Sequence, residues 1–167
     1  MAEHPTRRSR MRSRGTPGID KFDSTTYILY YLLLMTYNCT IEKNCDGLYV
    51  VQFPDMKNIM TCGNSHEEAL KMAEEALSGV LIVDLETGRP IAEPSFKGGY
   101  PIEVSPKIAF AIELRKARAG HSQKEVAAKA GMTYQQYQRL ENPRKTNPTL
   151  ETLYKLQKVF NRPFLAL

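Results

Sequence analysis

Two short helices joined by a tight turn are indicated by the stretch Ser122-Gln-Lys-Glu-Val-Ala-Ala-Lys-Ala-Gly-Met-Thr-Tyr-Gln-Gln-Tyr-Gln-Arg-Leu-Glu-Asn142. Ser122 followed by Glu125 is the capping-box pattern that opens a helix. Gly131 is expected to end that helix, because glycine adopts a positive φ more easily than other residues. Thr133 is a suitable cap for the second helix.

The second of these helices has a polar face with no evident structural purpose. Tyr137 and Leu140 lie three residues apart and are expected to face the core. The side chains left outside are Tyr134, Gln135, Gln138 and Arg139. Amide and guanidinium groups of this kind read base edges in the major groove of DNA. The face therefore predicts a DNA-reading surface.

Charge divides the chain into three parts. Residues 1–35 hold six Lys/Arg and three Asp/Glu, residues 36–105 hold five and eleven, and residues 106–167 hold twelve and four. An acidic middle and a basic C-terminal third predict two modules with different partners. The basic module suits nucleic acid, and the acidic one suits a basic protein.

Residues 1–35 are interpreted as a disordered or dispensable basic extension. The arginine-rich run 7–14 has no apolar face, which favours a solvated tail, and a nucleic-acid arm is the alternative. The apolar run 27–35 is too short to span a bilayer and lacks the features of a signal peptide, so no membrane partner is expected. Our hypothesis is that Met35 is the native start.

The acidic middle predicts a β-β-β-α-β module over residues 36–105. Strands are expected at 37–42, 48–53, 59–62 and 100–104, with turn chemistry at Asp46-Gly47. Ser65 with Glu68 opens a helix whose apolar residues recur at helical spacing to about Leu85. The fold class expected for the chain is therefore α+β, with an all-α module of four to five helices following at 106–167.

Four motifs of this module resemble the HicB antitoxin family: Asp46-Gly-Leu-Tyr-Val-Val-Gln-Phe-Pro-Asp55, Thr61-Cys-Gly63, His66-Glu-Glu-Ala-Leu70 and Ile91-Ala-Glu-Pro-Ser95. The loop 55–60 departs from the family pattern. The resemblance implies a partial RNase H-like fold. It also implies a role as antitoxin of a type II toxin–antitoxin pair, which binds and blocks a HicA-type, mRNA-cleaving toxin.

The basic third resembles the Xre family of DNA-binding domains, which contains phage lambda-type repressors. Helices are expected from Pro106 to about Ala119, in the two central segments, and after Thr149. The residues that carry the resemblance are Gly120-His-Ser-Gln123, Val126-Ala127, Gly131, Tyr137, Leu140-Glu-Asn142 and Pro148-Thr149. Tyr137 replaces a branched apolar residue, and Pro143 replaces a glycine. The resemblance implies that Gln123 contacts DNA and that the operator of its own gene pair is the target.

The predicted DNA-binding residues are Gln123, Lys124, Thr133, Tyr134, Gln135, Gln138, Arg139, Asn142, Arg144 and Lys145. Alternatives remain open. The lysines and Arg144 could be solubilising charge, and Arg139 could pair with Glu125 or Glu141 instead of a guanine. Glu141 is expected to pair with Lys116 or Arg115. Gln123 and Gln135 have few structural uses on an exposed face, which favours contact with DNA.

No catalytic residues, metal or cofactor are predicted. Cys39, Cys45 and Cys62 form no Cys-x-x-Cys pair, which fits a reducing cytoplasm, and a zinc site with His66 is the weaker interpretation. The acids of the middle module fit a solvated helix face better than a two-metal nuclease. We expect a cytoplasmic antitoxin and repressor that forms a homodimer or higher oligomer. The alternative is a stand-alone repressor with a ligand-sensing or dimerising first domain.

Overall fold

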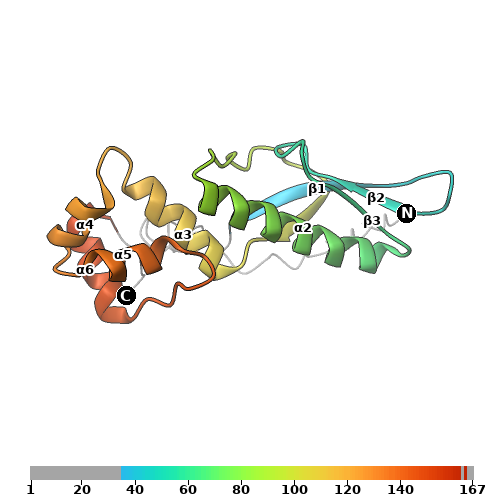
Figure 1. Cartoon of the computed structure of the whole chain (residues 1–167). Coiled ribbons are helices and arrows are strands. Elements are labelled where there is room, and N and C mark those ends of the chain that lie inside the picture. The colour runs from blue at the N-terminus through green and yellow to red at the C-terminus, as the bar shows by residue number, and fades with distance from the viewer. Residues whose placement is uncertain (1–34, 163, 165–167) are drawn as a thin grey trace, which may run out of the picture.

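An antiparallel sheet and one long helix form the first half of the computed structural model, which describes residues 35–162 and 164. The strands are β1 (Thr36–Lys43), β2 (Tyr49–Gln52), β3 (Met60–Gly63) and β4 (Tyr100–Glu103), in the order β3-β2-β1-β4. Helix α2 (His66–Thr87) lies across one face of the sheet (Figure 1). The β-β-β-α-β prediction is confirmed, with strand ends shifted by one residue at most. The interpretations of residues 1–34 lie outside the described residues.

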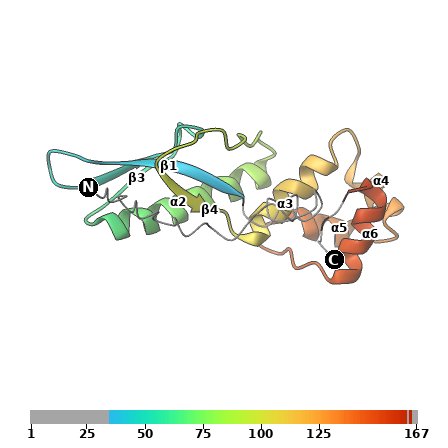
Figure 2. The same ribbon diagram turned by 180° about the vertical axis from the view of Figure 1, so that it is seen from behind.

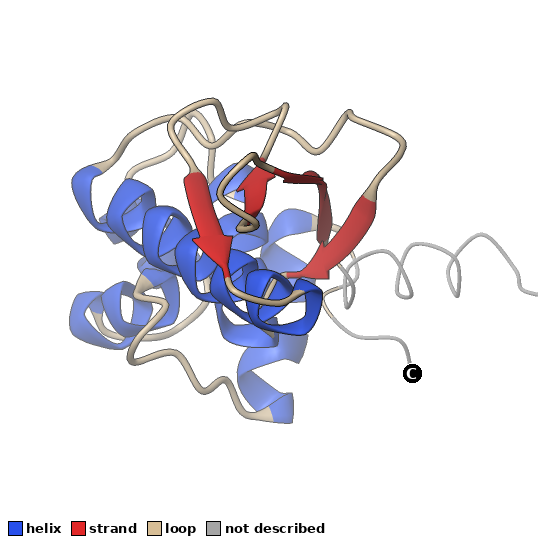
Figure 3. Cartoon of the chain, turned by 90° about the vertical axis from the view of Figure 1, so that its right-hand side faces the viewer, coloured by secondary structure: helices blue, strands red, loops and turns tan. Residues whose placement is uncertain are grey.

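The alternation of side chains along the strands builds the first core. Tyr37 and Cys39 on β1 are buried and face α2. Val51 is also buried on this side, and it pairs with Ile41 across the β1–β2 ladder. On the other side of β1, Tyr37 pairs with Ile102 of β4. Because strand side chains alternate between faces, these residues share one side of the sheet. The view along the length of the molecule shows the strands gathered on one side of the helices (Figure 3).

Helix α2 begins at a capped N-terminus and packs closely on the sheet. The Ser65 side chain accepts a hydrogen bond from the Glu68 amide at 3.1 Å, as the sequence predicts. The Glu68 carboxylate reaches one residue further back and accepts from the Asn64 amide. Gly63 allows this close approach, because a Cβ there would lie 2.5 Å from the Ala69 nitrogen. The helix ends at Gly88, which adopts a φ of 77°.

Four further helices make the second half of the molecule. They are α3 (Pro106–Ala117), α4 (Gln123–Lys129), α5 (Tyr134–Glu141) and α6 (Leu150–Phe160). Their shared core consists of Leu114, Val126, Ala127, Tyr137, Leu140 and Leu156. Gly131 has a φ of 63°, as predicted for the turn between α4 and α5. Figure 2 shows these helices at the opposite end of the molecule from the β1–β2 hairpin.

Helix α3 belongs to both halves. Ile108, Ala109, Ala111 and Ile112 are buried in the same core as the sheet and α2, whereas Leu114 is buried in the second core. Apolar residues on different sides of one helix can do this because successive side chains are spread around its axis. The two modules are therefore joined through packed side chains as well as through the chain itself.

A carboxylate clamp holds the connection between α2 and β4 against the sheet module. Asp55 accepts hydrogen bonds from the Ser95 hydroxyl, from the Phe96 amide at 3.0 Å and from the Ser95 amide at 2.9 Å. These donors, the Ser95 hydroxyl first, hold the pKa of Asp55 below its usual range. Nearby, the Tyr37 hydroxyl donates to the Ala92 carbonyl at 2.6 Å. The Asp55 and Ser95 motifs, forty residues apart, are thus one structural unit.

Asp55→Asn is expected to lower the thermal stability of the protein at pH 7, because a neutral amide has one acceptor oxygen for these donors. The depressed pKa means that the carboxylate stabilises the fold above its unfolded-state pKa of about 4, and that this contribution is lost as the pH falls through the lower folded-state pKa. The difference in Tm between wild type and variant should therefore shrink under acid conditions. Asp46→Asn, in the β1–β2 turn, is the control and should leave Tm unchanged at both pH values.

Candidate nucleic-acid interface

Helices α4 and α5 are each fixed by a complete capping box. The Ser122 hydroxyl accepts from the Glu125 amide at 3.2 Å, and the Glu125 carboxylate accepts from the Ser122 amide at 2.7 Å. This pair was predicted from the sequence. At α5, Thr133 accepts from the Gln136 amide at 3.2 Å, as predicted, and the Gln136 side chain accepts from the Thr133 amide at 2.8 Å, which the sequence interpretation missed. Thr133 and Gln136 therefore set the orientation of the exposed α5 face.

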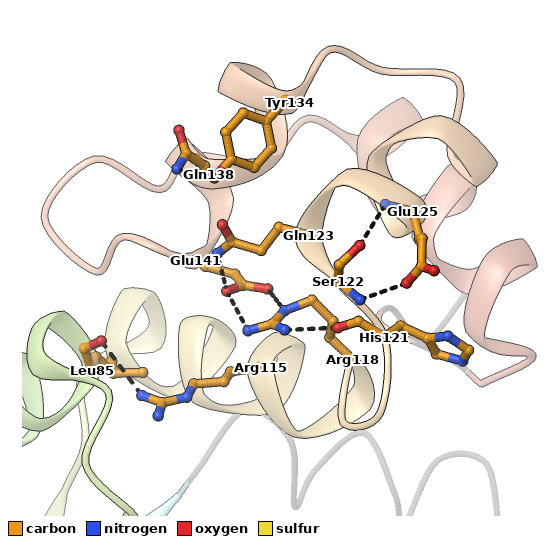
Figure 4. Close-up of polar contacts among 10 residues, drawn as sticks. All are labelled: Leu85, Arg115, Arg118, His121, Ser122, Gln123, Glu125, Tyr134, Gln138 and Glu141. Carbon is orange, nitrogen blue, oxygen red and sulfur yellow. Dashed lines mark hydrogen bonds and ion pairs between the residues drawn. The ribbon is translucent and has the colours of Figure 1, made fainter.

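The predicted reading residues lie together on α5. Gln135, Gln138 and Arg139 are exposed, and Tyr134 is half-buried. The Gln138 side-chain amide donates to the Tyr134 hydroxyl at 2.7 Å, and the two side chains lie side by side in Figure 4. The ammonium group of Lys124, on α4, lies 5.8 Å from the centre of the Tyr134 ring. This surface offers amides, a guanidinium and an ammonium group within one patch.

Behind this face, Glu141 connects three helices. Its carboxylate forms an ion pair with Arg118, just after α3, and accepts from the Gln123 side-chain amide, on α4, at 2.6 Å (Figure 4). The expected pairing of Glu141 with Lys116 or Arg115 is wrong. Lys116 instead pairs with Glu93 and Glu113, and Arg115 donates to the carbonyls of Asp84 and Leu85.

Gln123 is half-buried, so the view that it has few structural uses is also wrong. One of its two amide hydrogens is used by Glu141, which leaves the other and the carbonyl oxygen for a ligand. The two carboxylates named as alternative partners of Arg139 are both occupied, Glu125 by its capping box and Glu141 by Arg118. In the described part of the chain, Arg139 forms no ion pair.

Tyr137 fills the core, as predicted. Its side chain is fully buried among the second-core residues. Burial, and after it the nearby Glu141 carboxylate, raise the pKa of Tyr137 far above its usual value. The ring that departs from the Xre pattern is therefore a packing element with a neutral hydroxyl.

In the loop that follows α5, some of the residues predicted to contact DNA already form bonds within the protein. The Asn142 side-chain carbonyl accepts from the Arg144 amide at 2.9 Å, so a contact from Asn142 to DNA would come from its Nδ2. The Arg144 guanidinium, predicted to contact DNA with solubilising charge as the alternative, forms an ion pair with Glu86 of α2 at 2.8 Å. Lys145 is exposed and donates its backbone amide to the Asn142 carbonyl.

A groove of about 670 Å³ runs between the reading face and the end of α2. One wall consists of Leu85, Glu86, Thr87 and Gly88, and the floor includes Arg115 and Arg118. The other wall consists of Gln123, Gln135, Gln138, Arg139, Glu141, Asn142, Pro143 and Lys145. Six of the ten predicted DNA-binding residues therefore line one continuous hollow.

The cysteines and acidic residues form no metal site in the described part of the chain. Within 35–162 and 164, no three His, Cys, Asp or Glu side chains are grouped so that they could hold a metal ion. Cys39 is buried, while Cys45 and Cys62 are exposed. None of the helices in that part of the chain combines the length and apolar character needed to cross a membrane.

Comparison with known proteins matches each half of the chain to a family model. Residues 36–109 match the model of the HicB-like antitoxin of bacterial toxin–antitoxin systems, and residues 112–167 match a helix-turn-helix model. Antitoxin HicB 2 of Photorhabdus laumondii subsp. laumondii is 34% identical over 108 residues, which cover 64% of this chain and 77% of the relative. This chain belongs to the HicB antitoxin family. Antitoxin HicB 1 of the same organism is 31% identical over 108 residues, covering 64% and 70%.

Two features of this HicB-family chain were missed by sequence reasoning. Arg118, at the end of α3, holds Glu141, and Glu86, at the end of α2, holds Arg144. Arg115, Lys116 and Arg118 form a basic cluster at the end of α3, and sequence spacing alone could not show which of them faces α5. Nothing in the sequence brings Glu86 next to a loop of the helix-turn-helix domain.

Glu141→Ala is expected to lower the free energy of unfolding of this HicB-family protein by about 1–3 kcal/mol, because Arg118 and Gln123 lose a nearly buried acceptor. Denaturant unfolding followed by circular dichroism measures this. Glu151→Ala removes an exposed i,i+4 pair with Lys155 and should have little effect. Equal losses in the two variants would contradict the role given to Glu141.

Proposed function

We propose that this chain is the antitoxin of a type II toxin–antitoxin pair in the cytoplasm. In this proposal it neutralises a HicA-type, mRNA-cleaving toxin by direct binding, and it represses its own operon through sequence-specific DNA binding. The observation that carries the proposal is the union of a HicB-like module and a helix-turn-helix module in one chain. The first module holds five Lys/Arg against eleven Asp/Glu, and the second holds twelve against four.

The toxin-binding role rests on charge and family. A toxin that cleaves RNA needs a basic surface to hold its substrate. The exposed side of α2 carries Glu67, Glu74 and Glu75, which suit such a surface. Charge complementarity of this kind speeds association and selects the partner. Occlusion of the RNA-binding surface would then block cleavage without chemistry by the antitoxin.

The repressor role rests on the α5 face and the groove beside it. Tyr134, Gln135, Gln138 and Arg139 can reach base edges, as helices of this kind do in a major groove. Gln123, Lys124, Thr133, Asn142, Arg144 and Lys145 surround them and suit phosphate contacts. One such module binds modestly, so we propose a homodimer or higher oligomer that places two modules on half-sites about one DNA turn apart.

Gln135→Ala combined with Arg139→Ala should weaken binding to a duplex from upstream of the chain's own gene by about tenfold or more, because a bidentate base contact contributes about 1–3 kcal/mol. Neutralisation of the toxin should be retained. Fluorescence anisotropy and a growth-rescue assay with the co-expressed toxin measure the two activities.

The matched control is Gln157→Ala with Lys158→Ala, an amide and a cation on α6 of the same domain. This variant should bind the duplex like wild type. Full affinity in the α5 variant would refute the placement of the reading face.

A fragment of residues 1–119 should bind the product of the neighbouring toxin gene, whereas a fragment of residues 1–105 should be unstable. The shorter fragment lacks Ile108 and Ile112, which are buried against the sheet and α2. Loss of two large aliphatic side chains from a core costs about 4 kcal/mol or more. Thermal unfolding followed by circular dichroism and co-purification with the toxin measure these outcomes.

Equal stability of the two fragments would contradict the shared role of α3. Failure of the full chain to co-purify with the neighbouring gene product would contradict the antitoxin proposal itself. In that case DNA binding without a toxin partner would favour the stand-alone repressor.

A further inference from the structure

Glu86 belongs to the HicB-like module, yet its carboxylate contacts the helix-turn-helix domain. It lies in the last turn of α2 and accepts a hydrogen bond from Nε of Arg144 at 2.8 Å, across 58 residues of sequence. The two side chains are 38% and 61% exposed, so the pair lies at the surface, where a ligand can reach it. A surface ion pair of this kind is weak enough to be exchanged.

The pair stands at the edge of the proposed DNA site. Arg144 is held in the loop after α5 by its amide bond to Asn142, and Asn142 and Lys145 on either side of it line the groove. Glu86, Thr87 and Gly88 form the opposite wall. The last turn of α2 carries no basic residue, and Arg115 already donates to its Asp84 and Leu85 carbonyls, so the Glu86 carboxylate is the acidic group that this wall presents.

We propose that Glu86 competes with DNA phosphate for Arg144, so that the end of α2 acts as a built-in competitor of DNA binding. The inference rests on the DNA-binding role proposed above and adds a regulatory contact to it. The Nε–H of Arg144 can donate to the carboxylate or to a phosphate oxygen, but not to both with good geometry. A phosphate that takes this N–H therefore requires the ion pair to open, and a phosphate that takes one of the other four N–H groups of the guanidinium meets a charge that Glu86 already offsets.

The competition acts on the part of the affinity that does not depend on sequence. Phosphate contacts position the protein on DNA but carry no base information. Removal of the competitor should thus tighten binding to operator and unrelated DNA by the same factor. Because an exposed ion pair contributes little free energy, the expected factor is about two- to fivefold at low salt. Added salt screens the pair and should reduce the gain.

The test uses the full chain and two labelled duplexes, one from upstream of its own gene and one scrambled duplex of equal length and composition. Glu86→Gln keeps the size of the side chain and removes its charge. Glu75→Gln is the matched control, since it removes the same charge from an exposed site on α2, about 16 Å away along the helix. Glu86→Gln should bind both duplexes about two- to fivefold tighter than wild type, and Glu75→Gln should gain less than half of that.

A second pair of variants distinguishes the effect of the ion pair on DNA affinity from the long-range repulsion between the Glu86 charge and DNA. Arg144→Ala should weaken binding to both duplexes, and adding Glu86→Gln to it should then give less than half of the gain seen in the presence of Arg144. If Glu86→Gln binds like wild type, or tightens binding equally when Arg144 is absent, the inference is overturned while the DNA-binding proposal stands. If wild type binds neither duplex, the DNA-binding proposal fails and the inference fails with it. Circular dichroism melts confirm that all variants are folded.

Discussion

The simultaneous burial of α3 in two hydrophobic cores is the constraint on which the arrangement of this molecule depends. Ile108, Ala109, Ala111 and Ile112 complete the core of the sheet and α2, while Leu114 completes the core of the DNA-binding helices. A polypeptide linker alone would leave the modules free to reorient, as is usual for small interdomain contacts. Here the same rigid helix is part of both, and it brings the end of α2 to the side of α5 that carries the reading residues.

That proximity places opposite charges next to one another. Three contacts cross between the modules on the side of α2: Arg115 to the carbonyls of Asp84 and Leu85, Lys116 to Glu93, and Arg144 to Glu86. The first reaches carbonyls at the end of α2, of which that of Asp84 also accepts from the backbone amides of Gly88 and Arg89. Part of the positive charge of the basic domain is therefore paired with groups of the HicB-like module. The charge available for nucleic acid is smaller than the composition of residues 106–167 suggests.

Much of the fold could be predicted because residues close together in the sequence determine it. The caps at Ser65, Ser122 and Thr133, the positive φ of Gly131 and the inward position of Tyr137 each follow from residues a few positions apart. The exposed α5 face was predicted by the same periodicity. The partners of Glu141, Arg144 and Asp55 could not be predicted, because each contact joins segments eighteen or more residues apart. For Glu141 and Arg144, several residues of opposite charge were available, and the packing of the helices selects among them.

The Asp55 clamp also restricts where the chain could change length. The connection from Gly88 to Gly99 is tied at Ala92 by Tyr37 and at Ser95 and Phe96 by Asp55. A long loop costs little more to close than a short one, so insertions are tolerated where no contact fixes the backbone. Between these ties an added residue would break the spacing that both need. The Arg89 amide still donates to the Asp84 carbonyl, so the bond between Arg89 and Pro90, exposed and ahead of the first tie, is the place in this connection where an inserted peptide or tag would leave the sheet, the clamp and α3 undisturbed.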